Sequence, residues 1–149
     1  MKKALIFVLV AILTLSLAGC GDSEYYSFGE MTVVVGYDTP VSYTVDLTKV
    51  KDDNGVLSVL QYLSESEGLE LSFSDSGYGA YLTKVGDLEE NVLLGAYVYV
   101  YTSVQADKDV TIYATTIEYN GMTLTSSGLG VSEMTVEDGC TIYIGLIIW

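Results

Sequence analysis

One amphipathic helical segment lies among stretches with the pattern of β-strands, and this combination constrains the fold more than any other feature. In residues 56–63, Val56, Leu60 and Leu63 recur at spacings of four and three, which places them on one face of a helix. Gly68 follows as a C-terminal stop. A single such helix among strands predicts an α+β fold in which the helix packs on a sheet.

Seven stretches have the β-branched or alternating pattern of strands. The clearest is residues 41–47, where apolar and polar side chains alternate as in a half-buried strand. The other six are residues 31–35, 69–73, 78–85, 92–104, 111–119 and 134–148. Residues 37–40 form the turn of a first hairpin, and the acidic stretch 87–90 is expected to be a loop.

Three glycine-containing stretches predict turns between the later strands. Asn120-Gly121 between apolar runs is a strong hairpin signal, and Asp138-Gly139 is a second one of the same kind. Gly128 and Gly130 are expected in a loop that needs positive φ angles.

The first twenty residues have the layout of a secretory signal peptide. Lys2 and Lys3 precede an apolar run, and the segment closes on Leu17-Ala18-Gly19-Cys20. It resembles a bacterial lipoprotein signal, which implies cleavage before Cys20 and acylation of that cysteine. An ordinary signal peptide and an uncleaved anchor helix are the alternatives, although the run is shorter than the roughly 20 residues of a spanning helix.

We therefore expect three segments: a signal peptide over residues 1–19, a membrane tether over 20–30 and a folded domain over 31–149. Acyl chains on Cys20 would hold the domain at the extracytoplasmic face of the bacterial membrane. The mature chain would carry four lysines and twenty acidic residues, a formal net charge of −16, with no Arg or His. Because nucleic-acid binding needs basic side chains, this charge excludes it. Half of the residues are hydrophobic, which is enough for a folded core.

The residues that usually carry catalysis are scarce, so we predict a non-enzymatic protein without a metal site. Without His, acid–base chemistry falls to carboxylates, Lys or Tyr, and the pairs Glu89-Glu90 and Glu137-Asp138 lie in turn-like stretches typical of solvated surface. Zinc lacks His and paired Cys ligands. Residues 52–55 do not fit a calcium loop, and Asp53 and Asn54 serve better as helix caps.

Two further features concern single residue types. Cys140 would be the one cysteine left beside Cys20, and its apolar surroundings predict a small buried hydrophobe in a strand.

The chain has thirteen Tyr and three Phe, and Tyr97, Tyr99 and Tyr101 share one face of a strand whose other face is valine. Such tyrosines either form a ligand-binding surface or stabilise the sheet through cross-strand pairs, and the pattern leaves both open.

Three passages together resemble a known family. They are the strand pair with the helix core Val56-Leu57-Ser58-Val59-Leu60, the segment 78–86, and the motifs Tyr119-Asn120-Gly121, Ser127-Gly128-Leu129-Gly130 and 136–142. In this order they resemble the bacterial DUF4430 domains, which are similar to the C-terminal domain of the animal cobalamin carriers transcobalamin and intrinsic factor. The resemblance covers roughly residues 31–146.

The resemblance implies a β-grasp-like mixed sheet with one packed helix and a role in binding a soluble ligand. It adds Tyr119 and Asn120 to the candidate ligand-binding residues Tyr97, Tyr99 and Tyr101. The partner would be a neutral or cationic small molecule, a glycan, a peptide or another envelope protein. The resemblance also implies cobalamin or a related corrinoid as an alternative ligand. In the animal carriers a helical barrel shares that ligand, and 130 mature residues leave no room for one. A structural or adhesive accessory domain without a ligand is the alternative from another class.

Overall fold

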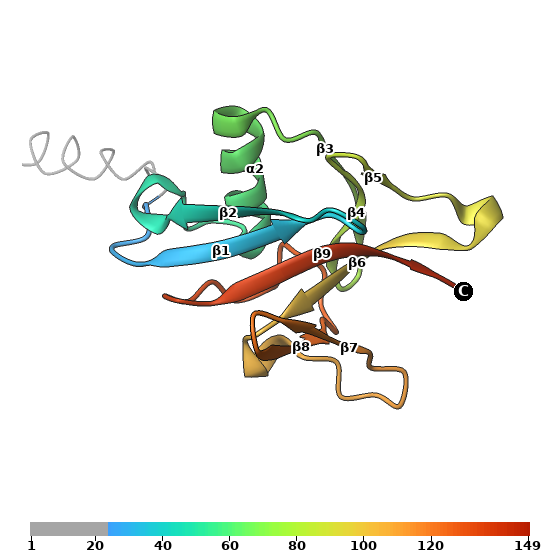
Figure 1. The fold of residues 1–149 in the computed structure, drawn as a ribbon. Helices are drawn as coiled ribbons and strands as arrows, with labels where there is room; N and C mark the ends of the chain where they lie inside the picture. Colours follow the sequence, from blue (N-terminus) through green and yellow to red (C-terminus); the bar gives the residue numbers. More distant parts are fainter. Residues whose placement is uncertain (1–23) are drawn as a thin grey trace, which may run out of the picture.

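The computed structural model describes residues 24–149, which form two β-sheets and one α-helix (Figure 1). The predicted acylation site, Cys20, lies outside these residues. The six-stranded sheet contains β1 (Glu30–Val35), β2 (Val41–Asp46), β6 (Ala96–Thr102), β7 (Thr116–Tyr119), β8 (Met122–Ser126) and β9 (Thr141–Ile148). The three-stranded sheet contains β3 (Leu71–Ser76), β4 (Gly79–Val85) and β5 (Leu88–Glu89). The helix is α2 (Gly55–Glu67), and three short 3-10 turns are η1 (Leu47–Lys49), η2 (Val92–Leu94) and η3 (Gln105–Asp107).

The larger sheet has the strand order β2-β1-β9-β6-β8-β7. Its β1–β9 pair is parallel, with Val33 opposite Ile142, and its other pairs are antiparallel. Figure 1 shows α2 lying across one face of the β2-β1-β9 part, while β8 and β7 turn away below. The fold is therefore α+β and β-grasp-like, as predicted.

Helix α2 buries the face that its periodicity predicted. Val56, Leu60 and Leu63 are buried in the main core, and Gly68 ends the helix in the left-handed conformation, with φ of 71°. The predicted capping was wrong, because the Asn54 side chain makes no capping hydrogen bond.

The start of the helix is held by Ser58 instead. The hydroxyl of Ser58 accepts a hydrogen bond from the Asn54 N–H at 3.0 Å and donates one to Asp53 Oδ1 at 2.6 Å. The bond from Asn54 satisfies an N–H just before the helix, whereas in the first turn the Leu57 N–H donates to the Val131 carbonyl at 3.0 Å.

Strand β6 separates two environments. Val98 and Val100 pack against the core under α2, whereas Tyr99 and Tyr101 project from the other face, where their ring centroids are 5.7 Å apart. The predicted division of this strand into a valine face and a tyrosine face is confirmed.

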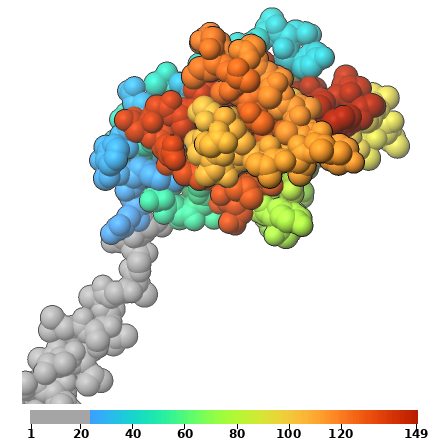
Figure 2. Space-filling model, turned by 90° about the horizontal axis from the view of Figure 1, so that it is seen from below, coloured from blue at the N-terminus to red at the C-terminus, as the bar shows by residue number. Residues whose placement is uncertain are grey.

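The region before β6 differs from the prediction in two ways. Residues 87–90 are not a loop, because Leu88 is buried and pairs with Val85 in the short strand β5. The strand predicted over 92–104 begins only at Ala96, since Val92–Leu94 form the 3-10 turn η2 and Leu93 is 97% exposed. Figure 2 shows the segment around η2 beside the C-terminal residues at one end of the molecule.

Two other predicted strands are shorter than their apolar patterns indicated. Residues 111–115 form turns, since the Asp109 carboxylate accepts hydrogen bonds from the N–H and the hydroxyl of Thr111. Residues 134–140 stay outside β9 because the buried Asp107 carboxylate accepts bonds from the Thr135 N–H at 2.8 Å and hydroxyl at 2.9 Å. Side-chain acceptors therefore replace ladder pairing at both places, although Asp109 is two residues from Thr111 and Asp107 is 28 residues from Thr135.

Of the three predicted glycine turns, two are confirmed and one is wrong. Asn120 and Gly121, with φ of 49° and 78°, form the predicted hairpin turn between β7 and β8. Gly139 has the positive φ of a turn, 75°. The Asp138 carboxylate beside it accepts a hydrogen bond from the Glu30 N–H, so this turn before β9 is attached to the start of β1.

For Gly128 and Gly130 the prediction was wrong, because neither has a positive φ. A Cβ at Gly130 would lie 2.5 Å from the carbonyl carbon of Gly79, so glycine is needed there for close backbone contact. The Val131 N–H, next in the chain, donates to the Ala80 carbonyl at 2.7 Å and ties this loop to β4.

The segment expected as a tether is attached to the domain from Glu24 onward. The Tyr26 N–H donates to the Val50 carbonyl at 3.1 Å, and the Asp52 N–H donates to the Glu24 carbonyl at 2.7 Å. Cys140 is buried, as predicted, but it lies just before β9 and not in a strand; its burial raises the pKa of the thiol. In the part of the chain from residue 24 onward, no helix has the length and apolar character to cross a membrane.

Candidate functional site

A hollow on the sheet face away from α2 is lined by tyrosines from three separate segments. We call it the tyrosine trough; its volume is about 300 Å³ and its lining residues are Gly36, Tyr37, Tyr101, Ile117, Glu118, Tyr143, Gly145 and Leu146. Tyr37 comes from the turn after β1, Tyr101 from β6 and Tyr143 from β9. This convergence of aromatic side chains is typical of a binding site.

The trough exists because the sheet curls. The rings of Tyr119 on β7 and Tyr143 on β9 meet edge-on at a centroid distance of 5.8 Å, although β6 and β8 lie between these strands in the sheet. The edge strand must therefore bend back over the sheet centre, and Figure 1 shows β8 and β7 swung below β9. The Thr115 hydroxyl lies 3.4 Å from the Tyr101 hydroxyl and closes one side.

Gly145 leaves room at the centre of the trough. It pairs with Tyr99 in the middle of the β9–β6 ladder, and its φ is outside the positive range, so its backbone conformation does not require glycine. A Cβ here would meet the Tyr143 ring at 3.3 Å and the Gly36 carbonyl at 3.7 Å. A glycine inside a strand often marks a place where another group approaches the backbone.

The polar groups of the trough are hydrogen-bonding phenols beside one carboxylate. Burial raises the pKa of Tyr143, and the neighbouring Tyr119 and Tyr101 add to this effect. A tyrosine hydroxyl is protonated at neutral pH even without this shift, so Tyr143 can donate a hydrogen bond to a ligand. Glu118 on β7 is the acidic residue in the lining.

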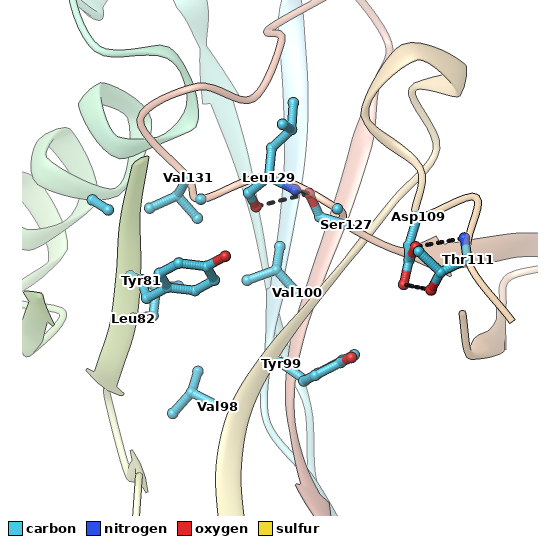
Figure 3. A pocket seen from close by; sticks show the side chains of 13 residues that line it. Tyr81, Leu82, Val98, Tyr99, Val100, Asp109, Thr111, Ser127, Leu129 and Val131 are labelled. Atoms are coloured by element: carbon cyan, nitrogen blue, oxygen red, sulfur yellow. Dashed lines mark hydrogen bonds between the residues drawn. The ribbon is translucent and has the colours of Figure 1, made fainter. Parts of the chain in front are cut away.

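A second hollow lies at the free edge of β6, between the two sheets. We call it the edge notch; its volume is about 320 Å³, and it is lined by residues 80–82, 98–100, 109, 111 and 127–131. Figure 3 shows Tyr81, Val98 and Val100 on one side and Tyr99 with Asp109 on the other. Burial and the nearby Asp109 carboxylate raise the pKa of Tyr99.

The notch leaves one backbone position of β6 without a neighbouring strand. The Trp149 N–H donates to the Gly95 carbonyl, so Gly95 and Trp149 are a hydrogen-bonded pair of the antiparallel β6–β9 ladder. Because such pairs alternate along an antiparallel ladder, the N–H and C=O of Val98 point away from β9. On that free edge, Ala96 is bonded to Asn91 and the Val100 carbonyl accepts the Ser127 N–H at 2.8 Å. Val98 lies between these two hydrogen-bonded positions, and it lines the notch.

The five residues that the sequence offered as ligand-binding do not form one site. Tyr101 lines the trough and Tyr99 lines the notch. Tyr119 supports the trough through its contact with Tyr143. Tyr97 is paired with Ile147 and Asn120 forms the hairpin turn; neither is among the residues that line the two hollows.

Sequence reasoning missed Tyr37, Tyr143 and Gly145 in the trough and Tyr81 in the notch. Gly145 carried a usable signal, because it interrupts the otherwise apolar and β-branched run of β9 without any turn residue beside it. Tyr37 carried none, since its position over the sheet depends on the turn that Gly36 and Pro40 make.

The described residues offer little for metal binding. Among residues 24–149 no group of three or more His, Cys, Asp or Glu is arranged to hold a metal ion.

Lys84, the lysine nearest a core strand, forms an ion pair with Glu70 at 2.5 Å, which raises the pKa of Lys84.

Two solved structures have folds similar to that of this chain. A proposed metal-binding protein from Ruminococcus gnavus ATCC 29149 is similar with a TM-score of 0.54 and 17% identity, over 81% of this chain and 98% of that one. Haptocorrin, solved in complex with Cbi, is similar with a TM-score of 0.59 and 14% identity, over 91% of this chain. The match spans 28% of the haptocorrin chain.

These similarities define a class of fold: the chain has the fold of one part of haptocorrin. No protein-family model matches the chain, so the resemblance to the DUF4430 domains rests on the sequence motifs alone. A search of curated proteins finds no match either.

Proposed function

We propose that this protein is a non-enzymatic, lipid-anchored binding module of the bacterial cell envelope, and that the tyrosine trough holds its ligand. The observation that carries the proposal is the convergence of Tyr37, Tyr101 and Tyr143 around Gly145. Tyrosines supply rigid contact area with a polar tip, and the glycine keeps the space between them open.

The size and charge of the site limit the ligand. A hollow of about 300 Å³ is at the lower end of small-molecule pockets. The chain has a formal net charge of −14, and the trough itself is lined by phenols, since the Glu118 carboxylate accepts a hydrogen bond from the Thr123 hydroxyl. Neutral or cationic small molecules, and the sugar units of a glycan, fit these conditions better than anions do. The free edge at Val98 offers a separate contact for an extended segment of an envelope protein.

Native mass spectrometry of the full-length chain in detergent tests the proposal. The protein is incubated with cell-envelope extract and separated from unbound material before measurement. We expect a retained mass in the small-molecule range. A chain that emerges without any added mass would favour the accessory, ligand-free alternative.

The anchoring part of the proposal rests on Leu17-Ala18-Gly19-Cys20. Metabolic labelling with an alkyne fatty acid should mark the wild-type chain, and the Cys20→Ala variant should stay unlabelled. Equal labelling of the two proteins would remove the lipoprotein hypothesis without affecting the trough.

A corrinoid is the second candidate ligand, favoured by the similarity to haptocorrin in complex with Cbi. Corrinoids are large, and an open hollow of about 300 Å³ encloses only part of one, whereas good sites bury 70–90% of a ligand. We therefore expect cobalamin to bind no more tightly than high micromolar, about −6 kcal/mol or weaker. Calorimetric titration with cobalamin measures this, and a nanomolar complex would place corrinoid capture first.

A further inference from the structure

A third hollow lies on the other side of the turn at residues 36–40, and its volume, about 610 Å³, is twice that of the trough. We call it the acidic cleft. Its lining consists of residues 35–39, Val41, Tyr43, residues 67–70, residues 86–88 and Leu146. It shares Gly36, Tyr37 and Leu146 with the trough. The two hollows meet where β9 continues beyond the end of β1, whose last pair is Val35 with Ile144.

Three chain reversals build the cleft. The first is the turn at 36–40, where a Cβ on Gly36 would lie 2.6 Å from the Pro40 Cα. The second is the end of α2 at Glu67 and Gly68. The third is the turn between β4 and β5, where Gly86 has a φ of 56° and a Cβ there would meet Leu69 at 3.3 Å. Each reversal contains a glycine, so the course of the backbone around the cleft is fixed at these three points.

The floor of the cleft is apolar and its sides carry two aromatic rings. Val35, Leu69 and Leu88 are buried beneath it. Tyr43 is half-buried and packs on the core, whereas Tyr37 is 59% exposed at the boundary with the trough. A cavity with an apolar floor and aromatic walls favours a ligand with an apolar body.

The charges around the cleft have one sign. Asp38, Glu67, Glu70 and Asp87 line it, and no lysine does. Lys84 lies nearby, but it is paired with Glu70, and neither of the two ion pairs in residues 24–149 involves Asp38, Glu67 or Asp87. Glu67 and Gly68, at the C-terminal end of α2, line the cleft, and a helix C-terminus carries partial negative charge.

The carboxylates are too dispersed for a metal ion, since no group of three acids in the described part of the chain is arranged to hold one. A cation that suits the cleft must therefore be larger than a metal ion and must tolerate an apolar floor. Tyrosine faces attract such organic cations through their ring quadrupole.

We propose that the acidic cleft binds a small organic cation of the alkylammonium class, with the charged nitrogen and its alkyl groups against the rings of Tyr37 and Tyr43 and the carboxylates of Glu67 and Asp87 around them. This goes beyond the function proposed for the trough, because it assigns a separate hollow and a ligand class. The cavity, its apolar floor and its aromatic walls carry the assignment, and the acids determine the sign of the ligand charge.

Choline and its neutral isostere 3,3-dimethyl-1-butanol test the proposal. Both are titrated into the full-length chain in non-ionic detergent and followed by saturation-transfer NMR and calorimetry. We expect choline to bind, and the isostere to bind at least about tenfold more weakly, because it lacks the charge. Equal binding of the two compounds, or no binding of choline, would overturn the proposal.

Matched variants locate the site. The double variant Glu67→Gln/Asp87→Asn removes two charges from the cleft and should weaken choline binding about fivefold or more. Glu65→Gln removes one charge from the exposed side of the same helix, away from the cleft, and should change binding less than twofold. Tyr43→Leu should also weaken binding, because it keeps an apolar side chain but removes a ring that lines the cleft and not the trough. Equal losses in the cleft variant and in Glu65→Gln would mean that overall charge, not this site, attracts choline.

Discussion

The two faces of the β6–β9 pair contrast sharply, although they are made of alternate residues of the same strands. On the face toward α2, Val98, Ile142 and Ile144 pack with the helix into the main core. On the opposite face, Tyr101 and Tyr143 surround Gly145 and leave a hollow of about 300 Å³. The period of two in a β-strand therefore separates a stabilising surface from a candidate binding surface within a few residues.

The difference between the faces lies in what covers them. A helix provides a continuous apolar stripe that can fill the space above a flat sheet. The far face is covered only by the curled edge of its own sheet, through the Tyr119–Tyr143 contact and the Tyr101–Thr115 hydroxyl pair. Because that cover is partial, we expect substitutions on the core face to affect stability and those on the trough face to affect binding.

The largest effect is expected from Leu60→Ala on the helix that covers the core face. Leu60 is fully buried, so its truncation should cost about 2–5 kcal/mol of unfolding free energy. Gln61→Ala, at an exposed position next to it, should stay within about 0.5 kcal/mol. Chemical denaturation gives both values, and similar losses at the two positions would mean that the buried face is misassigned.

A smaller loss is expected from Gly130→Ala, at the glycine where two backbones touch beside the edge notch. The new methyl group would lie 2.5 Å from the carbonyl carbon of Gly79 and 2.7 Å from the Ala80 oxygen, and backbone atoms cannot move aside as a side chain can. Overpacking of this kind costs about 1–3 kcal/mol. Gly121→Ala is the control for an open site, since nothing lies within 4 Å there and only its φ of 78° is strained.

Stability should also fall as the pH becomes alkaline. Burial, with the Asp52 carboxylate beside it, raises the pKa of Tyr26 far above its usual range, and burial raises those of Tyr99 and Tyr143. Above about pH 10 the unfolded chain therefore releases phenol protons that the folded chain keeps, and the equilibrium shifts toward unfolding. Cys140 acts in the same direction from about pH 8.5.

Denaturation at several pH values measures this slope. The contribution of these groups is fully present below their unfolded pKa values and is lost as the pH rises. Tyr26→Phe should flatten the fall above about pH 10, and a fall equally steep in the variant would assign it to other groups.

The smallest effect on stability is expected from Gly145→Ala, on the trough face. The added methyl group would contact the end of the Tyr143 ring at 3.3 Å, and that side chain can shift by a few tenths of an ångström. Replacing glycine with alanine also reduces the conformational entropy of the unfolded chain, which stabilises the folded state. This gain offsets the cost of the close contact with the Tyr143 ring. We expect a change within about 1 kcal/mol by chemical denaturation. A loss as large as that of Gly130→Ala would show that the trough is as tightly packed as the notch wall.

The sequence predicted what periodicity determines. Helix α2, the β1–β2 hairpin, the Asn120-Gly121 turn and the division of β6 into valine and tyrosine faces all follow from local spacing. The α+β class followed as well, because one amphipathic helix needs a sheet to cover it.

What the sequence did not predict depends on side-chain hydrogen bonds that end strands early and on contacts between distant segments. The short strand β7 begins at Thr116 because Asp109 and Thr111 form turns before it, and β9 begins at Thr141 because Asp107 bonds with Thr135. The trough joins residues 37, 101 and 143, which meet only after the sheet curls. The sequence found Tyr101 through its strand pattern but had no means to bring Tyr37 and Tyr143 to it.

The central claim is that the space above Gly145 holds the ligand, and one measurement tests it most directly. Wild type, Gly145→Ala and Gly145→Leu are each purified at full length, incubated with the same envelope extract and compared by native mass spectrometry. The leucine side chain fills the trough, whereas alanine fills little of it. If the ligand lies above Gly145, wild type should retain a mass, Gly145→Ala a reduced amount, and a folded Gly145→Leu chain none. An equal amount of the same ligand on wild type and Gly145→Leu would contradict the claim.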